Sequence, residues 1–242
     1  MSLPHFFAGA PDAGDSVVLA PEDARHAVRS LRLREGDEFT SSDGHGGLVR
    51  CRVVRAAHLL VEGEVVERTV EERPRPTLSV LLASPKGERL TWAVQKLAEL
   101  GADEIVLVEA SRSVRRWQGE RAARVGPRLE GVAREAAKQS RRRFLPSASG
   151  PVPWAEAVVP EEVPTIVLWE RATAGFLESL PAERPDALAL VVGPEGGIPE
   201  DEARAAEKAG ARLAGLGPAV LRTETAAVAA AAVALARYGR LG

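Results

Sequence analysis

The feature that constrains the fold most is a set of four short, uninterrupted apolar runs in the second part of the chain. The runs cover residues 78–83, 105–108, 166–169 and 188–192. Strands without polar alternation are typical of parallel sheets that are covered on both faces. Between most of these runs lie segments with helical periodicity, which are residues 89–100, 118–139, 199–209 and 223–238. Strands that alternate with helices predict an α/β sheet domain.

The first part of the chain has a different pattern. Residues 37–41, 48–56 and 59–70 alternate branched apolar residues with charged ones and are separated by glycine-rich or polar breaks. Such runs indicate the strands of a small β-barrel. A helix is predicted from Pro21 to about Leu33, because a proline followed by two acids suits the first turn of a helix.

The total length favours a medium domain together with a smaller one. The chain has 242 residues, which exceeds a typical single domain and falls short of two full ones. Residues 71–76 place two prolines within a charged run and break both patterns. We therefore predict a first domain over residues 1–72 and a second over residues 73–242.

Composition excludes several classes of protein. No apolar run approaches the length of a membrane span, and the first residues lack a basic segment followed by a long apolar one. We therefore expect a cytoplasmic protein. Cys51 is the single cysteine, which argues against a disulfide framework or a multi-cysteine zinc site and fits a small packing residue. The four histidines are scattered and are interpreted as structural or surface residues: His5, His26, His45 and His58.

Charge is unevenly distributed along the chain. The formal net charge is −2, yet residues 112–143 contain eleven Arg or Lys residues against three Glu residues, so the rest of the chain is about ten charges negative. This asymmetry fits a surface that binds a polyanion such as RNA. It fits a solvated helix surface equally well, so charge alone leaves both interpretations open.

The first segment with chemical content is residues 191–199, Val-Val-Gly-Pro-Glu-Gly-Gly-Ile-Pro. A buried strand ends there in a glycine-rich turn that leads into a helix. Glycines allow a ligand to approach the backbone, and the helix N-terminus offers unpaired N–H groups. The segment matches neither the Walker A pattern nor the dinucleotide fingerprint. It is therefore either a nucleotide-like ligand site without phosphate recognition or merely a tight turn.

The second such segment is residues 216–226. A strand ends in Gly-Pro, an apolar loop follows, and a helix begins with Thr223 or Thr225 as the expected cap and Glu224 near the positive end of its dipole. Helix capping leaves Arg222 unexplained, since a cation beside a helix N-terminus is electrostatically unfavourable. Arg222 therefore points to an anionic or electron-rich partner.

Two further segments carry charge at helical spacing. In residues 86–101, Lys96 and Glu99 lie three residues apart, as a surface ion pair would. Residues 135–143 join a helix end to three consecutive arginines. One cation at that position is explained by the helix dipole, whereas three in succession favour phosphate contacts.

Taken together, these segments resemble the RsmE family of ribosomal RNA methyltransferases, which belongs to the SPOUT class. The matching motifs are Lys86-Gly87-Glu88, Gln95-Lys96 with Glu99-Leu100-Gly101, Glu135-Ala136-Ala137 with Gln139-Ser140 and Arg142, residues 193–197, and Leu216-Gly217-Pro218 with residues 220–226. They occur in the family's order and span nearly all of the predicted second domain. Pro4, Phe6-Phe7 and residues 26–33 give weaker matches to the family's PUA-like RNA-binding barrel.

The resemblance implies a trefoil-knotted parallel sheet domain after a PUA-like barrel, and a homodimer that binds S-adenosylmethionine without metal. The implied reaction is methylation of N3 of a uridine in small-subunit (16S) rRNA. The implied cofactor-binding residues are Leu168, Gly193, Pro194, Glu195, Gly196, Gly197, Ile198, Leu216, Gly217, Pro218, Val220, Leu221 and Thr225. The expected RNA-binding residues are Lys86, Arg112, Lys138, Arg141, Arg142 and Arg143.

Uridine N3 carries a proton, so its methylation requires a stabilised uridinate anion. A cation in a water-poor site stabilises such an anion. We assign this role to Arg222, with Arg142 of the same or the partner subunit as the second candidate. Glu224 and Glu195 are candidate proton acceptors, for which helix capping or loop bracing are the alternatives.

The chain departs from the family pattern at four positions. The family often has an acid at Lys138, Gly at Arg141, and Arg at both Ala219 and His5. Ribose 2′-O-methylation is the nearest alternative function, but SPOUT enzymes of that kind resemble one another in asparagine-containing motifs, and this chain has no Asn. A non-catalytic RNA-binding protein for ribosome assembly would not need the two glycine-containing segments.

Overall fold

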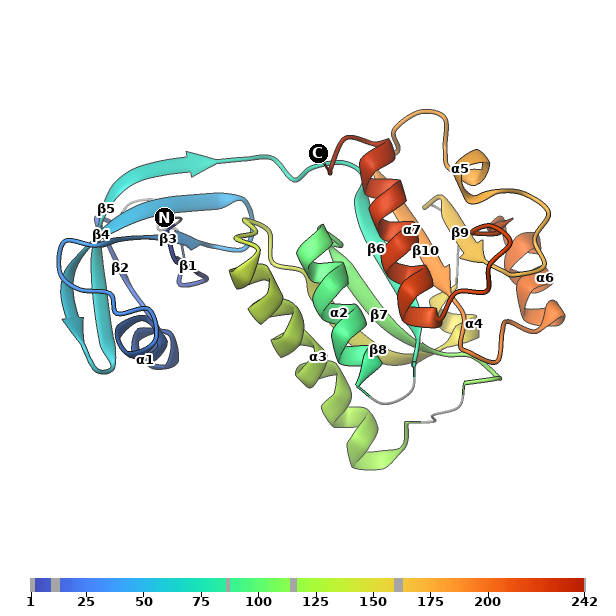
Figure 1. Ribbon diagram of the computed structural model, residues 1–242, viewed down its shortest axis with the longest axis horizontal. Coiled ribbons are helices and arrows are strands. Elements are labelled where there is room, and N and C mark those ends of the chain that lie inside the picture. The colour runs from blue at the N-terminus through green and yellow to red at the C-terminus, as the bar shows by residue number, and fades with distance from the viewer. Residues whose placement is uncertain (1–2, 10–13, 86–87, 114–116, 159–162, 242) are drawn as a thin grey trace. The chain divides into compact units, whose positions relative to one another are not determined.

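The computed structural model describes residues 3–9, 14–85, 88–113, 117–158 and 163–241. It divides into two compact units (Figure 1). Unit 1 consists of Met1–Arg73 with Ala137–Leu145, and unit 2 consists of Pro74–Ala136 with Pro146–Gly242. None of the helices in the described ranges is long and apolar enough to span a membrane.

Residues 137–145 lie in unit 1, whereas the sequence pattern places them in the second domain. Their backbone explains the difference. The Leu145 N–H donates to the Gly44 carbonyl over 3.0 Å, and the Ser42 hydroxyl donates to the Arg143 carbonyl over 2.6 Å. Contacts of this kind join residues far apart in the sequence, so no local pattern signals them.

In its described part, unit 1 contains a five-stranded sheet and helix α1 (Pro21–Arg29). The strands are β1 (His5–Phe6), β2 (Ser16–Val18), β3 (Glu38–Ser42), β4 (Gly47–Ala57) and β5 (Leu60–Val70). Their order is β1-β3-β4-β5-β2, with every pair antiparallel except β1 and β3. Helix α1 ends earlier than predicted. Cys51 is fully buried in the core and acts as a packing residue, as expected.

In its described part, unit 2 contains a parallel sheet with the order β11-β9-β10-β6-β7-β8. Its strands are β6 (Thr77–Ala83), β7 (Glu104–Glu109), β8 (Ser147–Pro153), β9 (Thr165–Leu168), β10 (Ala187–Val192) and β11 (Arg212–Ala214). The four apolar runs form β6, β7, β9 and β10, the central strands, so the predicted α/β sheet is confirmed. Strand β8 was not predicted, because Gly150, Pro151 and Pro153 interrupt its pattern.

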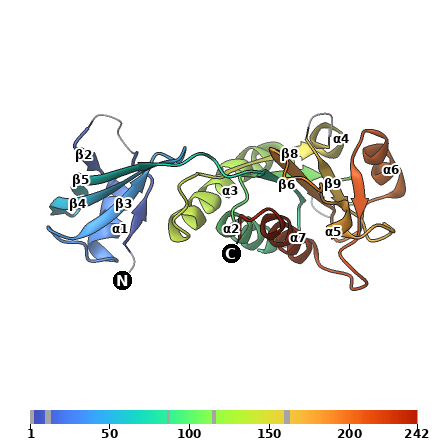
Figure 2. The ribbon, with the colours of Figure 1, turned by 90° about the horizontal axis from the view of Figure 1, so that it is seen from above.

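Helices cover both faces of this sheet, as Figure 2 shows for α2 and α7 on one side and α4 and α6 on the other. The helices are α2 (Arg89–Leu100), α3 (Gly119–Gln139), α4 (Trp154–Ala157), α5 (Phe176–Ser179), α6 (Glu200–Lys208) and α7 (Thr223–Arg237). Successive residues of β10 point to opposite faces: Leu190 packs with α2, α3 and α7, and Val191 packs with α4 and α6. This explains why the strands have no polar alternation.

Helix α7 packs against α2, β6 and β10 in the middle of the unit. Its buried face consists largely of alanines, among them Ala227, Ala230, Ala231 and Ala234. Small side chains let the helix approach the sheet closely, as its composition predicts. Strand β11 pairs with β9 at the sheet edge. Residues 215–222, which connect this edge strand to α7, therefore pass the carboxyl ends of β9 and β10.

Candidate active site

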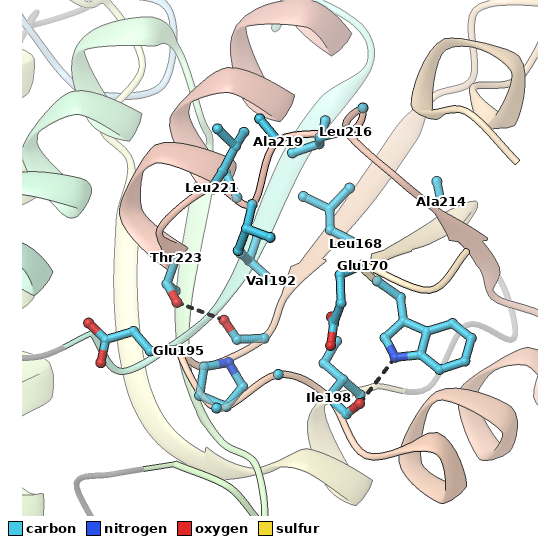
Figure 3. A pocket seen from close by; sticks show the side chains of 18 of the residues that line it. Leu168, Glu170, Val192, Glu195, Ile198, Ala214, Leu216, Ala219, Leu221 and Thr223 are labelled. Atoms are coloured by element: carbon cyan, nitrogen blue, oxygen red, sulfur yellow. Dashed lines mark hydrogen bonds between the residues drawn. The ribbon is translucent and has the colours of Figure 1, made fainter. Parts of the chain in front are cut away.

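A pocket of about 300 Å³ lies at the carboxyl ends of β9, β10 and β11 (Figure 3). Ligands of open α/β sheets commonly bind at this end. Three segments line the pocket: the end of β9, the turn after β10, and the connection from β11 to α7. The lining residues are Leu168, Trp169, Glu170, Val192, Gly193, Pro194, Glu195, Gly196, Gly197, Ile198, Ala214, Leu216, Gly217, Pro218, Ala219, Val220, Leu221, Thr223 and Ala226.

The turn after β10 requires glycine at two positions. Gly197 has φ +74°, and its N–H donates to the Pro194 carbonyl over 2.9 Å. A Cβ at position 197 would lie 2.6 Å from a carboxylate oxygen of Glu170, and one at position 193 would collide with Cγ1 of Ile198. A larger residue at either position would therefore displace Ile198 or Glu170, both of which line the pocket. The two glycines let this turn, the glycine cradle, pack tightly along one side of the pocket.

The connection from β11 to α7 forms the opposite wall. Gly217 has φ +110°, and Val220 is 91% exposed although it is apolar. The prediction that Thr223 or Thr225 caps α7 is wrong. Arg222 occupies the N-cap position without a side-chain cap, and the Thr223 hydroxyl donates to the Gly193 carbonyl over 3.0 Å.

The end of β9 contributes residues that sequence reasoning missed. Leu168 was predicted, but Trp169 and Glu170 also line the pocket. The Trp169 indole N–H donates to the Ile198 carbonyl over 3.1 Å and fixes the turn after β10. Glu170 carries a carboxylate into the pocket region (Figure 3). Their position in the sequence could have identified them, because they directly follow a buried parallel strand, as Gly193 does.

Charged side chains gather beside the pocket. Arg89, the first residue of α2, contacts both Glu195 and Glu224, over 3.0 Å and 3.5 Å. Glu224 is buried at the start of α7. Arg222 is exposed next to Leu221 and Thr223, and within the described part of the chain its guanidinium has no ion-pair or hydrogen-bond partner.

The structure separates the remaining candidates. Thr225 is exposed and does not line the pocket, whereas Thr223 does. Lys86 lies outside the described residues. Arg112 lies in unit 2, where its side chain donates to the Gly196 carbonyl over 3.4 Å. It is therefore placed beside the glycine-rich turn.

Lys138 and the three consecutive arginines belong to unit 1. Lys138 forms a largely buried ion pair with Asp23 over 2.7 Å, which engages its ammonium group. Arg143 pairs with Glu71 over 3.0 Å. Arg141 has φ +54°, a conformation that favours glycine. Arg141 therefore carries backbone strain that a glycine at this position would relieve.

His5 is confirmed as a structural histidine. Its ring nitrogens contact the Thr40 hydroxyl over 2.9 Å and the Arg142 carbonyl over 3.0 Å. The pKa of His5 is lowered from 6.5 to about 4: burial lowers it most, the hydrogen bond to the Arg142 carbonyl raises it, and the charges of Arg141 and Arg143 lower it by smaller amounts. His5 is therefore neutral at pH 7. Among the residues that the structure describes, no group of three or more His, Cys, Asp or Glu side chains is arranged to hold a metal.

The fold and the pocket define an RNA methyltransferase with an N-terminal PUA-like domain. Two family models agree: one described as "RNA methyltransferase domain" matches residues 71–235, and one described as "RNA methyltransferase PUA domain" matches residues 19–66.

Individual relatives specify the family. Ribosomal RNA small subunit methyltransferase E of Mycobacterium tuberculosis is 39% identical over 96% of this chain and 88% of its own. The Bacillus subtilis protein of the same name is 31% identical over 85% of this chain and 84% of its own. A Neisseria gonorrhoeae enzyme of that name, crystallised with S-adenosylmethionine, aligns with a TM-score of 0.86, 27% identity and 98% coverage of both chains. The chain therefore belongs to the RsmE family, as its motifs predict.

Proposed function

We propose that this chain transfers a methyl group from S-adenosylmethionine to N3 of a uridine in small-subunit (16S) ribosomal RNA. The observation that carries the proposal is the glycine-built pocket, which occurs at the strand ends of a chain belonging to the RsmE family. The uridine N3 position follows from the motif resemblance, and the absence of Asn disfavours ribose methylation.

The pocket suits S-adenosylmethionine in size and chemistry. Its volume of about 300 Å³ is at the lower end of the range for small-molecule sites. Leu168, Ala214 and Leu216 form an apolar end that suits a purine. Gly193 and Gly197 line the pocket without side chains of their own, so a ligand can approach the backbone of this turn. These residues, with the other lining residues, would hold the methyl donor.

When bound, S-adenosylmethionine supplies an electrophilic methyl group on a positively charged sulfur. Uridine N3 must lose its proton before it accepts a methyl group, and a uridinate anion develops. Arg222 is the cation that we assign to this anion, because its side chain is exposed beside two pocket-lining residues. Arg142, in unit 1, is the second candidate. Glu224 is our candidate proton acceptor, supported by its burial next to Thr223.

We propose that unit 1 contacts the RNA through Arg141, Arg142 and Arg143. Arginines are suited to phosphate contacts, and the PUA-domain model covers most of this unit. Lys138 is left out of this surface because its ion pair with Asp23 is buried. Arg112 remains a candidate RNA-binding residue, because it lies beside the glycine-rich turn.

We also propose that the chain is a cytoplasmic homodimer and that residues 215–222 thread a trefoil knot. Helices α2 and α7 pack against each other, and each has an exposed apolar side chain: Trp92 is 45% exposed and Val233 is 36% exposed. These exposed apolar residues support the dimer.

The knot is supported by the passage of the chain from the edge strand β11 to the central helix α7. The proposed ribosomal RNA substrate supports the cytoplasmic location.

Mass-spectrometric mapping of modified nucleosides tests the proposal. Ribosomal RNA from cells without the gene should lack one N3-methyluridine that is present in the parent, and the purified chain with S-adenosylmethionine should restore it. Loss of a 2′-O-methylnucleoside instead would support the ribose alternative. An unchanged set of modified nucleosides would support a non-catalytic role.

A further inference from the structure

One guanidinium group spans two of the segments that line the pocket. Nη1 of Arg89 lies 3.0 Å from Oε1 of Glu195, in the turn after β10. Nε of the same residue lies 3.5 Å from Oε1 of Glu224, in the first turn of α7. Arg89 itself begins α2. A single side chain therefore joins the beginnings of two helices to the glycine-rich turn.

Glu224 is the member of this group that most needs a partner. It is 7% exposed, and its Oε2 atom has no hydrogen-bond partner within the described residues. A buried carboxylate is unfavourable unless it is paired. The dipole of α7 supplies part of the compensation, and Arg89 supplies the counter-charge.

Arg89 is itself placed against the dipole of α2, because a cation at a helix N-terminus is unfavourable. Packing of α2 does not explain the charge, since the guanidinium is partly exposed and directed to the two carboxylates. Without it, the carboxylates of Glu195 and Glu224, which both lie within 3.5 Å of this guanidinium, would repel each other as like charges beside the pocket. The charge of Arg89 is therefore explained by its two carboxylate partners beside the pocket and not by the stability of α2.

We infer that Arg89 is a positioning residue for the methyl-donor site, an inference that rests on the proposed function. By holding Glu195 and Glu224 together it keeps the turn after β10 closed against the start of α7. The hydrogen bond from Thr223 to Gly193 joins the same two segments. Because Arg222 lies two residues before Glu224, the ion pair also fixes the direction from which Arg222 reaches the reacting base.

Calorimetric titration with S-adenosylmethionine tests the inference on the full-length chain. We expect Arg89→Ala to weaken binding by about tenfold or more and Arg89→Lys, which keeps one charge contact, by about threefold. Glu224→Gln in the Arg89→Ala background should restore part of the loss, because the unpaired buried charge is then removed although no side chain joins the two segments. Arg124→Ala is the matched control, since Arg124 pairs with Glu120 on the exposed surface of α3, and it should bind normally.

Two results would overturn the inference. Normal binding by Arg89→Ala would show that the ion pairs do not position the site. The absence of any improvement by Glu224→Gln in the double variant would show that Arg89 does not act by compensating the charge of Glu224. Should Arg89→Ala fail to fold, the same comparison is made with Arg89→Lys alone and combined with Glu224→Gln.

Hydrogen exchange separates this inference from the proposed function. Without any methyl donor, Arg89→Ala should speed amide exchange in residues 193–198 and 223–226 and leave β7 unchanged. If the unmodified chain does not bind S-adenosylmethionine, the proposed function fails, yet the exchange result still decides whether Arg89 holds the two segments. Unchanged exchange in both segments would refute the positioning role.

Discussion

The Thr223 hydroxyl donates a 3.0 Å hydrogen bond to the Gly193 carbonyl, thirty residues away in the sequence. Gly193 directly follows β10 and Thr223 begins α7, so this bond closes the two sides of the pocket on each other (Figure 3). The bond also explains why Thr223 is buried although it does not cap its helix.

Thr223→Val removes this hydrogen bond and preserves the shape of the side chain. It leaves the Gly193 carbonyl without this donor, at a typical loss of about 1 kcal/mol, or roughly fivefold in affinity. We expect S-adenosylmethionine binding, measured by calorimetry, to weaken by that factor. Thr225→Val, one residue beyond Glu224 on the exposed side of α7, should have no effect. A larger loss from Thr225→Val would support the sequence-based assignment of Thr225 to the cofactor site.

The glycine cradle gives a second prediction. Gly193→Ala places a Cβ against Ile198 and should displace the turn after β10. Overpacking of this kind typically costs about 1–3 kcal/mol, and we expect binding of S-adenosylmethionine to fall by about tenfold or more. Gly131→Ala is the control, because a Cβ at this position within α3 meets no atom within 4 Å. Full binding by Gly193→Ala would show that the cradle is not where the ligand sits.

A third prediction separates chemistry from binding. Arg222→Ala should lower kcat by about 10²-fold or more, as loss of a group that stabilises an anionic transition state does. The affinity for S-adenosylmethionine should stay within about twofold, because Arg222 does not itself line the pocket. An assay of methyl transfer to small-subunit RNA measures kcat, and calorimetry measures the affinity for S-adenosylmethionine. Parallel loss of both would reassign Arg222 to structural support of the loop.

Residues 193–198 and 216–221 illustrate what the sequence alone predicted. Their glycines, prolines and strand-end positions were visible without a structure, and the structure places both segments around one pocket. Arg89 was not assigned a role, since its two partners lie 106 and 135 residues further along the chain. Local patterns report secondary structure and turns. They do not report which distant side chains an ion pair brings together.

The arginines of unit 1 give a fourth prediction, on RNA binding. Replacement of Arg141, Arg142 and Arg143 by alanine should weaken RNA binding and reduce the slope of log K against log salt by about 1 for each lost phosphate contact. Alanine and arginine are both strained at the positive φ of position 141, so this substitution should leave the stability of the fold unchanged there. Arg204→Ala, which removes a pairing partner of Glu207 in α6, is the control. An unchanged slope would remove these residues from the RNA surface.

The buried histidine of unit 1 gives a prediction on pH. Burial lowers the pKa of His5 to about 4, below its ordinary value of 6.5. Between these values the unfolded chain binds a proton that the folded chain does not, so protonation favours unfolding. The stability that neutral His5 contributes is complete above about pH 6.5 and is lost as the pH falls towards 4.

His5→Gln measures this contribution, because glutamine keeps polar contacts and cannot titrate. At about pH 5 the linkage amounts to about 2 kcal/mol in the free energy of unfolding. The parent chain should therefore lose about 2 kcal/mol more than His5→Gln when urea unfolding of unit 1 is compared at about pH 7 and about pH 5. Equal losses in the two proteins would mean that His5 accepts its proton in the folded state, and that the ring does not need to be neutral to hold the Arg142 carbonyl.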